Sequence, residues 1–255
     1  MQEFMVTVIT PCFNSAKTIE RTIKSVLAQE FKDYEYIIVD GGSTDGTLEI
    51  IKKYEPLFEG RMHWKSEPDK GLYDAFNKGI ERSTGIYCWN VNADDFIEPD
   101  ALKNLKIVIE QQDQNNLPVI SGAMHFLKED GITLIRDYIS SKEGEILCYK
   151  KNGMGVNHPA TLVPRYIYDK YGTFDTRFKI SGDMDWFNRI CKAKVPILHL
   201  AIFITNMTDG GVSNQPNFVK FARDRWLQYT KKYDNFLTTI FYFMKWTINY
   251  LRNKI

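Results

Sequence analysis

The chain has 255 residues, of which 44% are hydrophobic and 25% charged, and its formal net charge is +1. These values are ordinary for a soluble globular protein with one large domain, or a domain with an appendage. The near-neutral total excludes a strongly basic nucleic-acid-binding protein, so we expect no nucleic-acid partner. Residues 214–255, however, hold eight Lys and Arg against Asp224 and Asp234, a net +6 that leaves −5 elsewhere. A basic tail of this kind predicts an anionic surface as partner.

The cysteines and the N-terminus indicate the compartment. Cys12, Cys88, Cys148 and Cys191 are widely spaced and form no CxxC or Cys/His cluster, so the sequence predicts reduced thiols rather than zinc or a disulfide framework. The N-terminus enters a predicted strand without a signal-peptide pattern. No apolar run approaches the roughly 20 residues that span a bilayer. We therefore expect a cytoplasmic protein.

The first hundred residues alternate between strands and helices. Buried strands are predicted at residues 5–10, 34–39 and 86–91, and a further strand, at the edge of the sheet, is predicted at 62–66. Helices are predicted after Ser15, from about Thr44 and from Leu72. This alternation is typical of βαβ units, which form a parallel sheet with right-handed crossovers. The fold class is therefore α/β with a Rossmann-like, mainly parallel central sheet.

Ligands of such sheets bind beyond the carboxyl ends of the strands, where Asn14, Asp40 and Asp94–Asp95 all fall. The adjacent carboxylates of Asp94 and Asp95 repel one another and lose water beside a buried strand. A divalent cation carrying a diphosphate would compensate them. The alternative is that one of them caps the next turn.

Asp40 and Phe13 suit a nucleobase. A carboxylate just past a buried strand accepts hydrogen bonds from N3–H of uracil or thymine, or from N1–H and N2–H of guanine. Phe13 offers a flat apolar wall to the same base. The alternatives are an Asx-turn at Asp40 and a core position for Phe13. The glycines at 41, 42 and 46 allow close backbone approach, but they match neither a Walker loop nor a GxGxxG fingerprint.

Asp69 and Lys70 lie between the predicted edge strand and the helix from Leu72. Because this position is at the ligand edge of the sheet and near a helix N-terminus, we expect Lys70 to meet a phosphate and Asp69 a ribose or base group.

Four blocks in this order resemble the N-terminal blocks of family 2 glycosyltransferases: Thr10–Asn14 (TPCFN), Val39–Thr47 (VDGGSTDGT), Glu67–Gly79 (EPDKGLYDAFNKG) and Asn92–Asp95 (NADD). The resemblance covers about the first 215 residues. It implies the GT-A fold and an inverting, metal-dependent enzyme that uses a nucleotide-diphosphate sugar. In the family, the residue matching Asp40 binds the base, that matching Asp69 helps to hold the nucleotide, and the Asp pair acts as the DxD motif. The expected donor nucleotide-binding residues are Pro11, Phe13, Asn14, Asp40, Asp69, Lys70 and Asp94, with Asp95 and Asp94 on Mg²⁺ or Mn²⁺.

The second half of the sequence does not continue the βαβ pattern. Residues 119–126 and 132–138 predict a hairpin, and this half should shape the acceptor side, as it does in the family. A further block, residues 174–189, resembles the family block that carries the catalytic base. Here Asp183 matches the base, while the Glu that usually precedes it is replaced by Gly182. The alternative for Asp183 is helix capping. Asp185 is expected to pair with Arg189 instead.

Three further residues are candidate contacts for phosphate or acceptor. His158 stands near the predicted mouth of the cleft, and the family often has a His in this block, although a lone His is more often structural. Gly211 and Ser213 resemble a family Gly-Gly-x-Ser segment near the diphosphate, and a plain turn is the alternative.

The C-terminal segment predicts two helices, the first at residues 217–232 and the second from Phe236. The second is broadly apolar, with cations and a narrow polar stripe of Thr238, Tyr242, Lys245, Asn249 and Arg252. This pattern fits a helix that lies in the membrane interface, on the inner leaflet, better than a helix that spans the bilayer. The competing explanation is packing on the domain or on a second subunit, so a homo-oligomer stays open. We expect a glycosyltransferase domain at 1–213, with a donor half (1–97) and an acceptor half (98–213), and a helical extension at 214–255.

The resemblance thus predicts single-displacement transfer from a nucleotide-sugar donor, UDP-linked by preference, to a glycan or lipid-linked acceptor, with Asp183 as general base. Two other functions stay open. A sugar nucleotidyltransferase would share the sheet and the metal carboxylates but needs a Gly-rich, cationic loop after the first strand, unlike residues 10–14. A non-catalytic membrane-associated binding module would leave the acidic cluster inert. The sequence names neither the sugar nor the acceptor.

Overall fold

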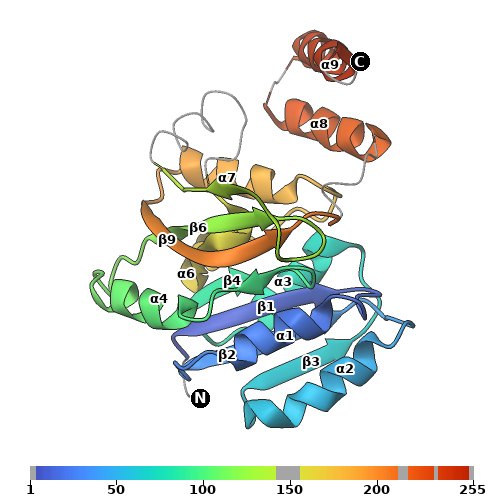
Figure 1. Cartoon of the computed structure of the whole chain (residues 1–255). Coiled ribbons are helices and arrows are strands. Elements are labelled where there is room, and N and C mark those ends of the chain that lie inside the picture. Colours follow the sequence, from blue (N-terminus) through green and yellow to red (C-terminus); the bar gives the residue numbers. More distant parts are fainter. Residues whose placement is uncertain (1–3, 142–155, 212–217, 233–234, 253–255) are drawn as a thin grey trace.

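The computed structural model describes residues 4–141, 156–211, 218–232 and 235–252. Its N-terminal part contains four parallel strands in the order β3-β2-β1-β4 (Figure 1). They are β1 (Val6–Cys12), β2 (Tyr34–Asp40), β3 (Met62–Ser66) and β4 (Tyr87–Asn90). Every residue of β1, β2 and β4 is buried, as β-branched and aromatic runs predict. The expected parallel sheet, with β3 at its edge, is confirmed.

The helices that connect these strands are α1 (Ile19–Leu27), α2 (Thr47–Tyr54) and α3 (Leu72–Arg82), and the short 3-10 helix η1 (Glu55–Phe58) follows α2. The helix α2 begins three residues later than the sequence predicted. The reason is local: Gly46 has φ 96°, and the Asp45 carboxylate accepts hydrogen bonds from the N–H and hydroxyl of Thr47. These contacts extend the loop after β2 across the ligand edge before the helix starts.

The second half continues the same sheet in the order β4-β8-β6-β9-β5, and β7 pairs with β6. The strand β8 is antiparallel to both of its neighbours, while β6 and β9 are parallel. The β6–β7 pair confirms the predicted hairpin. The elements of this half are β5 (Phe96–Ile97), α4 (Ala101–Glu110), β6 (Val119–Leu127), β7 (Leu134–Tyr138), η2 (His158–Ala160), β8 (Thr161–Pro164), α6 (Arg165–Tyr171), α7 (Gly182–Lys192) and β9 (Ile197–Thr208).

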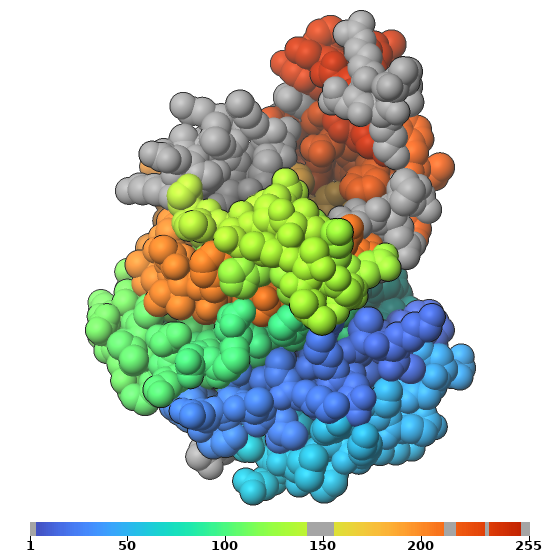
Figure 2. Space-filling model, in the orientation of Figure 1, coloured from blue at the N-terminus to red at the C-terminus, as the bar shows by residue number. Residues whose placement is uncertain are grey.

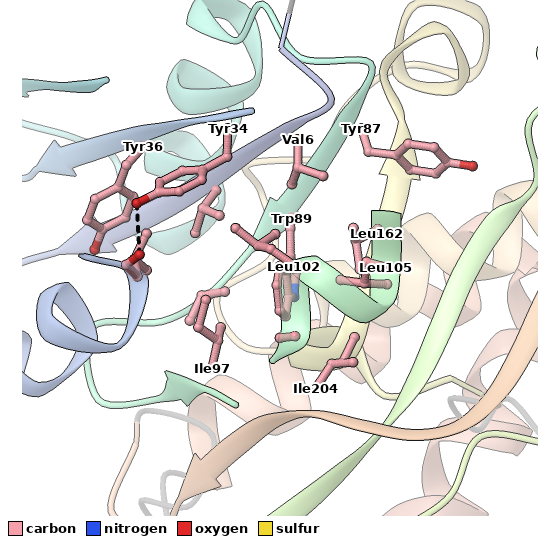
Figure 3. Packing of buried hydrophobic residues seen from close by; sticks show 14 of the residues in the cluster. Val6, Tyr34, Tyr36, Tyr87, Trp89, Ile97, Leu102, Leu105, Leu162 and Ile204 are labelled. Carbon is pink, nitrogen blue, oxygen red and sulfur yellow. Dashed lines mark hydrogen bonds between the residues drawn. The ribbon is translucent and has the colours of Figure 1, made fainter. Parts of the chain in front are cut away.

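Trp89 lies at the centre of the main core, where the two halves of the sheet join (Figure 3). It is fully buried and packs in one cluster with Leu102 of α4, Leu162 of β8 and Ile204 of β9. Its indole N–H donates to the Pro159 carbonyl at 2.8 Å, so its polar atom is satisfied. The segment Asn92–Asp95 follows this strand, and the packing of Trp89 therefore fixes where that segment begins.

Two helices, α8 (Phe218–Lys232) and α9 (Phe236–Arg252), stand beyond the sheet (Figures 1 and 2). They confirm the helices predicted for the C-terminal segment. Among the described helices, we find none whose length and apolarity would let it cross a membrane.

Candidate active site

The carboxylate of Asp40 is enclosed at the end of β2. It has no exposed surface, and its oxygens accept hydrogen bonds from the N–H groups of Gly42 and Ser43, from the hydroxyls of Ser43 and Ser66, and from the Cys12 thiol. A carboxylate has about four lone-pair sites, so these donors occupy it. Burial works against the charged form, but the hydrogen bonds prevail and lower its pKa. Asp40 thus holds the loop after β2 in the Asx-turn that the sequence left as an alternative. A direct hydrogen bond from a base to this carboxylate would require one of these donors to leave.

Phe13, Gly41 and Asp69 form an open slot beside this loop. Phe13 is 62% exposed, which excludes the core alternative for this ring. A Cβ on Gly41 would lie 2.5 Å from Asp69 Oδ2 and 3.3 Å from Phe13 Cδ2, so the carboxylate and the ring meet over the bare glycine. Asp69 Oδ1 accepts from Gly71 N–H at 2.8 Å, and Oδ2 accepts nothing from the described residues. The slot therefore offers a flat wall and an available acceptor.

The residues around the slot hold it in place. Pro11 is buried within β1 opposite Val39, so its ring is not exposed to a ligand. Asn14 takes φ 50°, donates its N–H to Ser43 Oγ and accepts from Thr44 N–H through its side chain. Lys70 is exposed at the same edge.

Asp94 and Asp95 follow β4 as predicted. Asp95 is 1% exposed, and its two oxygens accept from Thr208 N–H at 3.0 Å and from Asn92 Nδ2 at 2.9 Å. Burial raises the pKa of both carboxyls, and the charge of Asp94 raises that of Asp95 further. A Cβ on Gly211 would lie 2.9 Å from Asp94 Oδ2, so this glycine backbone borders the pair. Ser213 lies outside the described residues.

This pair suits a magnesium-type ion. The described residues hold no group of three or more His, Cys, Asp or Glu side chains that would enclose a metal. Mg²⁺ is commonly bound by one or two carboxylates together with substrate phosphates, rather than by a complete protein cage. Two desolvated carboxylates with raised pKa values fit that pattern, because a cation would favour their charged forms.

Asp183 opens onto a cavity of about 470 Å³. It is the second residue of α7, and Tyr73 Oη of α3 lies 3.2 Å from its Oδ1 and 2.5 Å from the Ile180 carbonyl, so the single phenol proton is shared between two acceptors. Its Oδ1 also accepts from the adjacent Met184 N–H, while the N-cap position belongs to Ser181. His158 and Asn92 line the same cavity. Because Asn92 also donates to Asp95, one side chain joins the acidic pair to the cavity of Asp183.

His158 is the buried imidazole of this cavity. It is 8% exposed, and its Nε2 has no hydrogen-bond partner among the described residues. The rings of Phe76, Phe174 and Phe187 present edges to it at centroid distances of 5.4 to 6.2 Å. Burial lowers its pKa, against the charge of Asp183, so the imidazole is held neutral. An unpaired buried nitrogen at a cavity wall is available to a ligand hydroxyl.

The sequence did not identify Asp224 as part of this site. It lies in α8 without exposed surface, and its carboxylate accepts from the N–H groups of Lys179, Ile180 and Ser181 at 2.7 to 3.0 Å. It therefore holds the loop immediately before Asp183. An acidic residue within a basic helix gave no signal of this role, because the contact joins segments more than forty residues apart.

Arg21 was also missed, and it donates to the Asp94 carbonyl at 2.8 Å. In contrast, the expected ion pair of Asp185 with Arg189 is confirmed at 3.5 Å, and Lys231 joins it at 2.9 Å.

Comparison with known proteins gives consistent matches. The family model described as Glycosyl transferase family 2 matches residues 7–172. A "PGL/p-HBAD biosynthesis glycosyltransferase" of Mycobacterium bovis is 28% identical over 217 residues, covering 82% of this chain and 79% of that protein. The "Putative teichuronic acid biosynthesis glycosyltransferase TuaG" of Bacillus subtilis is 41% identical over 109 residues, covering 42% and 43%.

Solved structures share the architecture. S. aureus TarS 1-349 in complex with UDP-GlcNAc matches with a TM-score of 0.71 and 19% identity over 89% of this chain, and the match spans 66% of that chain. The mannosyltransferase PcManGT from Pyrobaculum calidifontis, in complex with GDP-Man and Mn²⁺, matches with a TM-score of 0.62 and 17% identity, covering 90% and 63%. At these identities the likeness shows a common fold.

Proposed function

Because the chain belongs to glycosyl transferase family 2 and is a glycosyltransferase with the GT-A fold, we propose that it is an inverting enzyme that transfers a sugar from a UDP-sugar to a hydroxyl of a glycan or lipid-linked acceptor. The observation that carries the proposal is the position of Asn92. This side chain donates to Asp95 and lines the cavity of Asp183, so the acidic pair and the base candidate serve one site.

The donor base binds in the slot of Phe13, Gly41 and Asp69. The ring of Phe13 stacks on the base, and Asp69 Oδ2 accepts its N3–H. Asp40 contributes by fixing the N–H groups of Gly42 and Ser43. A carboxylate acceptor suits uracil and also guanine. We favour uridine because TarS, the structure with the higher TM-score of the two described, is in complex with UDP-GlcNAc, whereas PcManGT is in complex with GDP-Man.

Asp95 and Asp94 would hold Mg²⁺ or Mn²⁺ against the diphosphate. When bound, the ion supplies positive charge where the leaving nucleoside diphosphate becomes more negative. Asn92 Nδ2 and Thr208 N–H orient the carboxylate of Asp95. Lys70, which is exposed at the ligand edge of the sheet, provides a cation for the phosphates. Gly211 brings its backbone beside Asp94 without a side chain in the way.

Asp183 takes the proton from the acceptor hydroxyl as that oxygen attacks the anomeric carbon. The new bond joins the acceptor oxygen to the anomeric carbon, the bond from that carbon to the phosphate oxygen breaks, and the electron pair leaves with the nucleoside diphosphate. A single displacement inverts the anomeric centre. Tyr73 Oη holds the carboxylate in place, and His158 Nε2 offers a hydrogen bond to a substrate hydroxyl within the same cavity.

We further place residues 1–213 as the transferase domain, residues 214–255 as an extension, and the enzyme on the cytoplasmic face of a membrane. The support is the basic charge of the extension and the amphipathic character of α9.

The deciding experiment compares the wild type with Asp183→Asn. Thermal shifts with a panel of nucleoside diphosphates and their sugars, with and without Mn²⁺, measure donor binding. Transfer is measured as nucleoside diphosphate released in the presence of acceptor. Asp183→Asn should keep the donor-induced shift and lose transfer, while Asp113→Asn, an exposed acid on the turn after α4, should change neither.

Near-wild-type transfer by Asp183→Asn, with donor still bound, would show that the base is another group. Pyrophosphate formed from a nucleoside triphosphate would favour the nucleotidyltransferase instead.

A further inference from the structure

The helix α9 has two different apolar faces. One face packs on α8 through aromatic rings: Phe243 lies 5.2 Å from Trp226, and Phe218 lies 6.2 Å from Trp246 and 5.2 Å from Tyr250, measured between ring centroids. Arg225 of α8 adds a cation 5.6 Å from the Trp246 ring. This face joins the two helices into a pair.

The other face is an exposed apolar stripe, which we define as Leu237, Phe241, Met244 and Ile248. The spacing of four, three and four residues places these side chains on one side of the helix. Their exposed fractions are 74%, 62%, 58% and 48%. Contiguous apolar side chains at such exposure mark an interaction surface rather than scattered surface residues.

The charges around the stripe are of one sign. No Asp or Glu occurs in α9, and Lys245 is exposed beside the stripe. In α8 the only acidic residue is Asp224, whose carboxylate is buried against the loop before α7. Lys220 and Arg223 of α8 are exposed. The described surface of the helix pair is therefore cationic around an apolar stripe.

We propose that this stripe inserts into the headgroup region of an anionic lipid bilayer. Apolar and aromatic side chains on one face, with lysine at its border, are the features that hold a helix in a membrane interface. A second copy of the chain is a poorer occupant. Pairing two identical stripes would bring two sets of lysines together without acidic residues on either helix to offset them.

The position of α8 gives this docking a consequence for catalysis. Phe221 of α8 lines the cavity that contains Asp183. A bilayer held by α9 would therefore lie next to the element that borders the acceptor side. Resting on the proposed function, the inference specifies the acceptor class: an amphiphile whose hydroxyl-bearing head enters the cavity while its apolar part stays in the same bilayer.

The test is cosedimentation of the full chain with vesicles of phosphatidylcholine alone or mixed with phosphatidylglycerol. Wild type should bind the mixed vesicles, release at raised ionic strength, and bind phosphatidylcholine at least tenfold more weakly. The double variant Phe241→Gln/Met244→Gln should lose at least tenfold in partitioning. The matched control Leu57→Gln/Ile107→Gln, which changes two apolar residues of comparable exposure (53% and 52%) outside α8 and α9, should bind as wild type.

Absence of wild-type binding to the mixed vesicles, or equal binding by the stripe variant, would overturn the proposal. A wild-type dimer in light scattering that the stripe variant dissociates would assign the stripe to a second copy instead. The donor-induced thermal shift of the same variants separates this result from the proposed function. A chain that binds vesicles but no nucleotide would refute the transferase mechanism alone, whereas one that binds donor but no vesicles would refute the docking alone.

Discussion

Replacing Asp224 by asparagine tests whether α8 positions the loop before Asp183, the proposed base. The carboxylate accepts hydrogen bonds from three backbone N–H groups at residues 179 to 181, immediately before Asp183. Asparagine keeps the shape but not the charge. A hydrogen bond to a charged group contributes about 1 kcal/mol more than a neutral one. With three such donors, the loop loses about 3 kcal/mol of stabilisation. A loss of this size, carried fully into the transition state, would lower kcat about 150-fold.

The assay for Asp224→Asn is kcat well below the melting temperature, together with the thermal shift caused by UDP and Mn²⁺. We expect a reduced kcat and an unchanged ligand-induced shift, because the donor slot lies on other elements. Asp113→Asn is the control, since this exposed acid binds only within its own turn. A kcat within about twofold of wild type would refute the positioning role, because a loss of about 3 kcal/mol carried into the transition state lowers kcat far more than twofold. An equal loss of donor binding would also refute it.

Three further changes probe the site. Gly41→Ala places a Cβ 2.5 Å from Asp69 Oδ2, so UDP affinity measured by calorimetry should fall about tenfold, corresponding to about 1.4 kcal/mol, and unchanged affinity would remove Asp69 from the base slot. His158→Phe should leave the melting temperature within a few degrees while lowering kcat/KM, and full activity would show that Nε2 meets no substrate. Burial and the charge of Asp94 raise the pKa of Asp95 above its usual value, so the folded chain keeps a proton that the unfolded chain has released. The apo stability therefore falls as pH rises from the unfolded to the folded pKa. Asp95→Asn lacks this proton, so its free energy of unfolding, measured by chemical denaturation, should fall less with pH than that of wild type. The difference between the two proteins should therefore grow with pH, and a difference that stays constant would contradict the prediction.

The sequence predicted the parallel sheet because the central strands are largely apolar and β-branched, and because the turns after them carry glycine and acidic residues. It also identified the pair Asp94–Asp95 and the position of Asp183 on a helix. These features are local patterns or matches to family blocks.

Other features depend on contacts between distant segments. That Asp40 is occupied by five protein donors, and that Asp69 Oδ2 is available over Gly41, follow from how three loops meet. Asp224 likewise required the placement of α8. No periodicity in one segment encodes such a meeting. The sequence therefore identified most of the candidate residues, but not Asp224 or Arg21, and not the contacts that each candidate makes.

The strand β8 is hydrogen-bonded to β4 on one side and to β6 on the other. Backbone hydrogen bonds thus join the two halves of the sheet at the position where a two-domain enzyme would have its hinge. Swinging the two sides apart would break these backbone bonds and expose Trp89, which is unfavourable in free energy. We therefore expect any movement on substrate binding to lie in the loops and helices around the sheet rather than between its two halves.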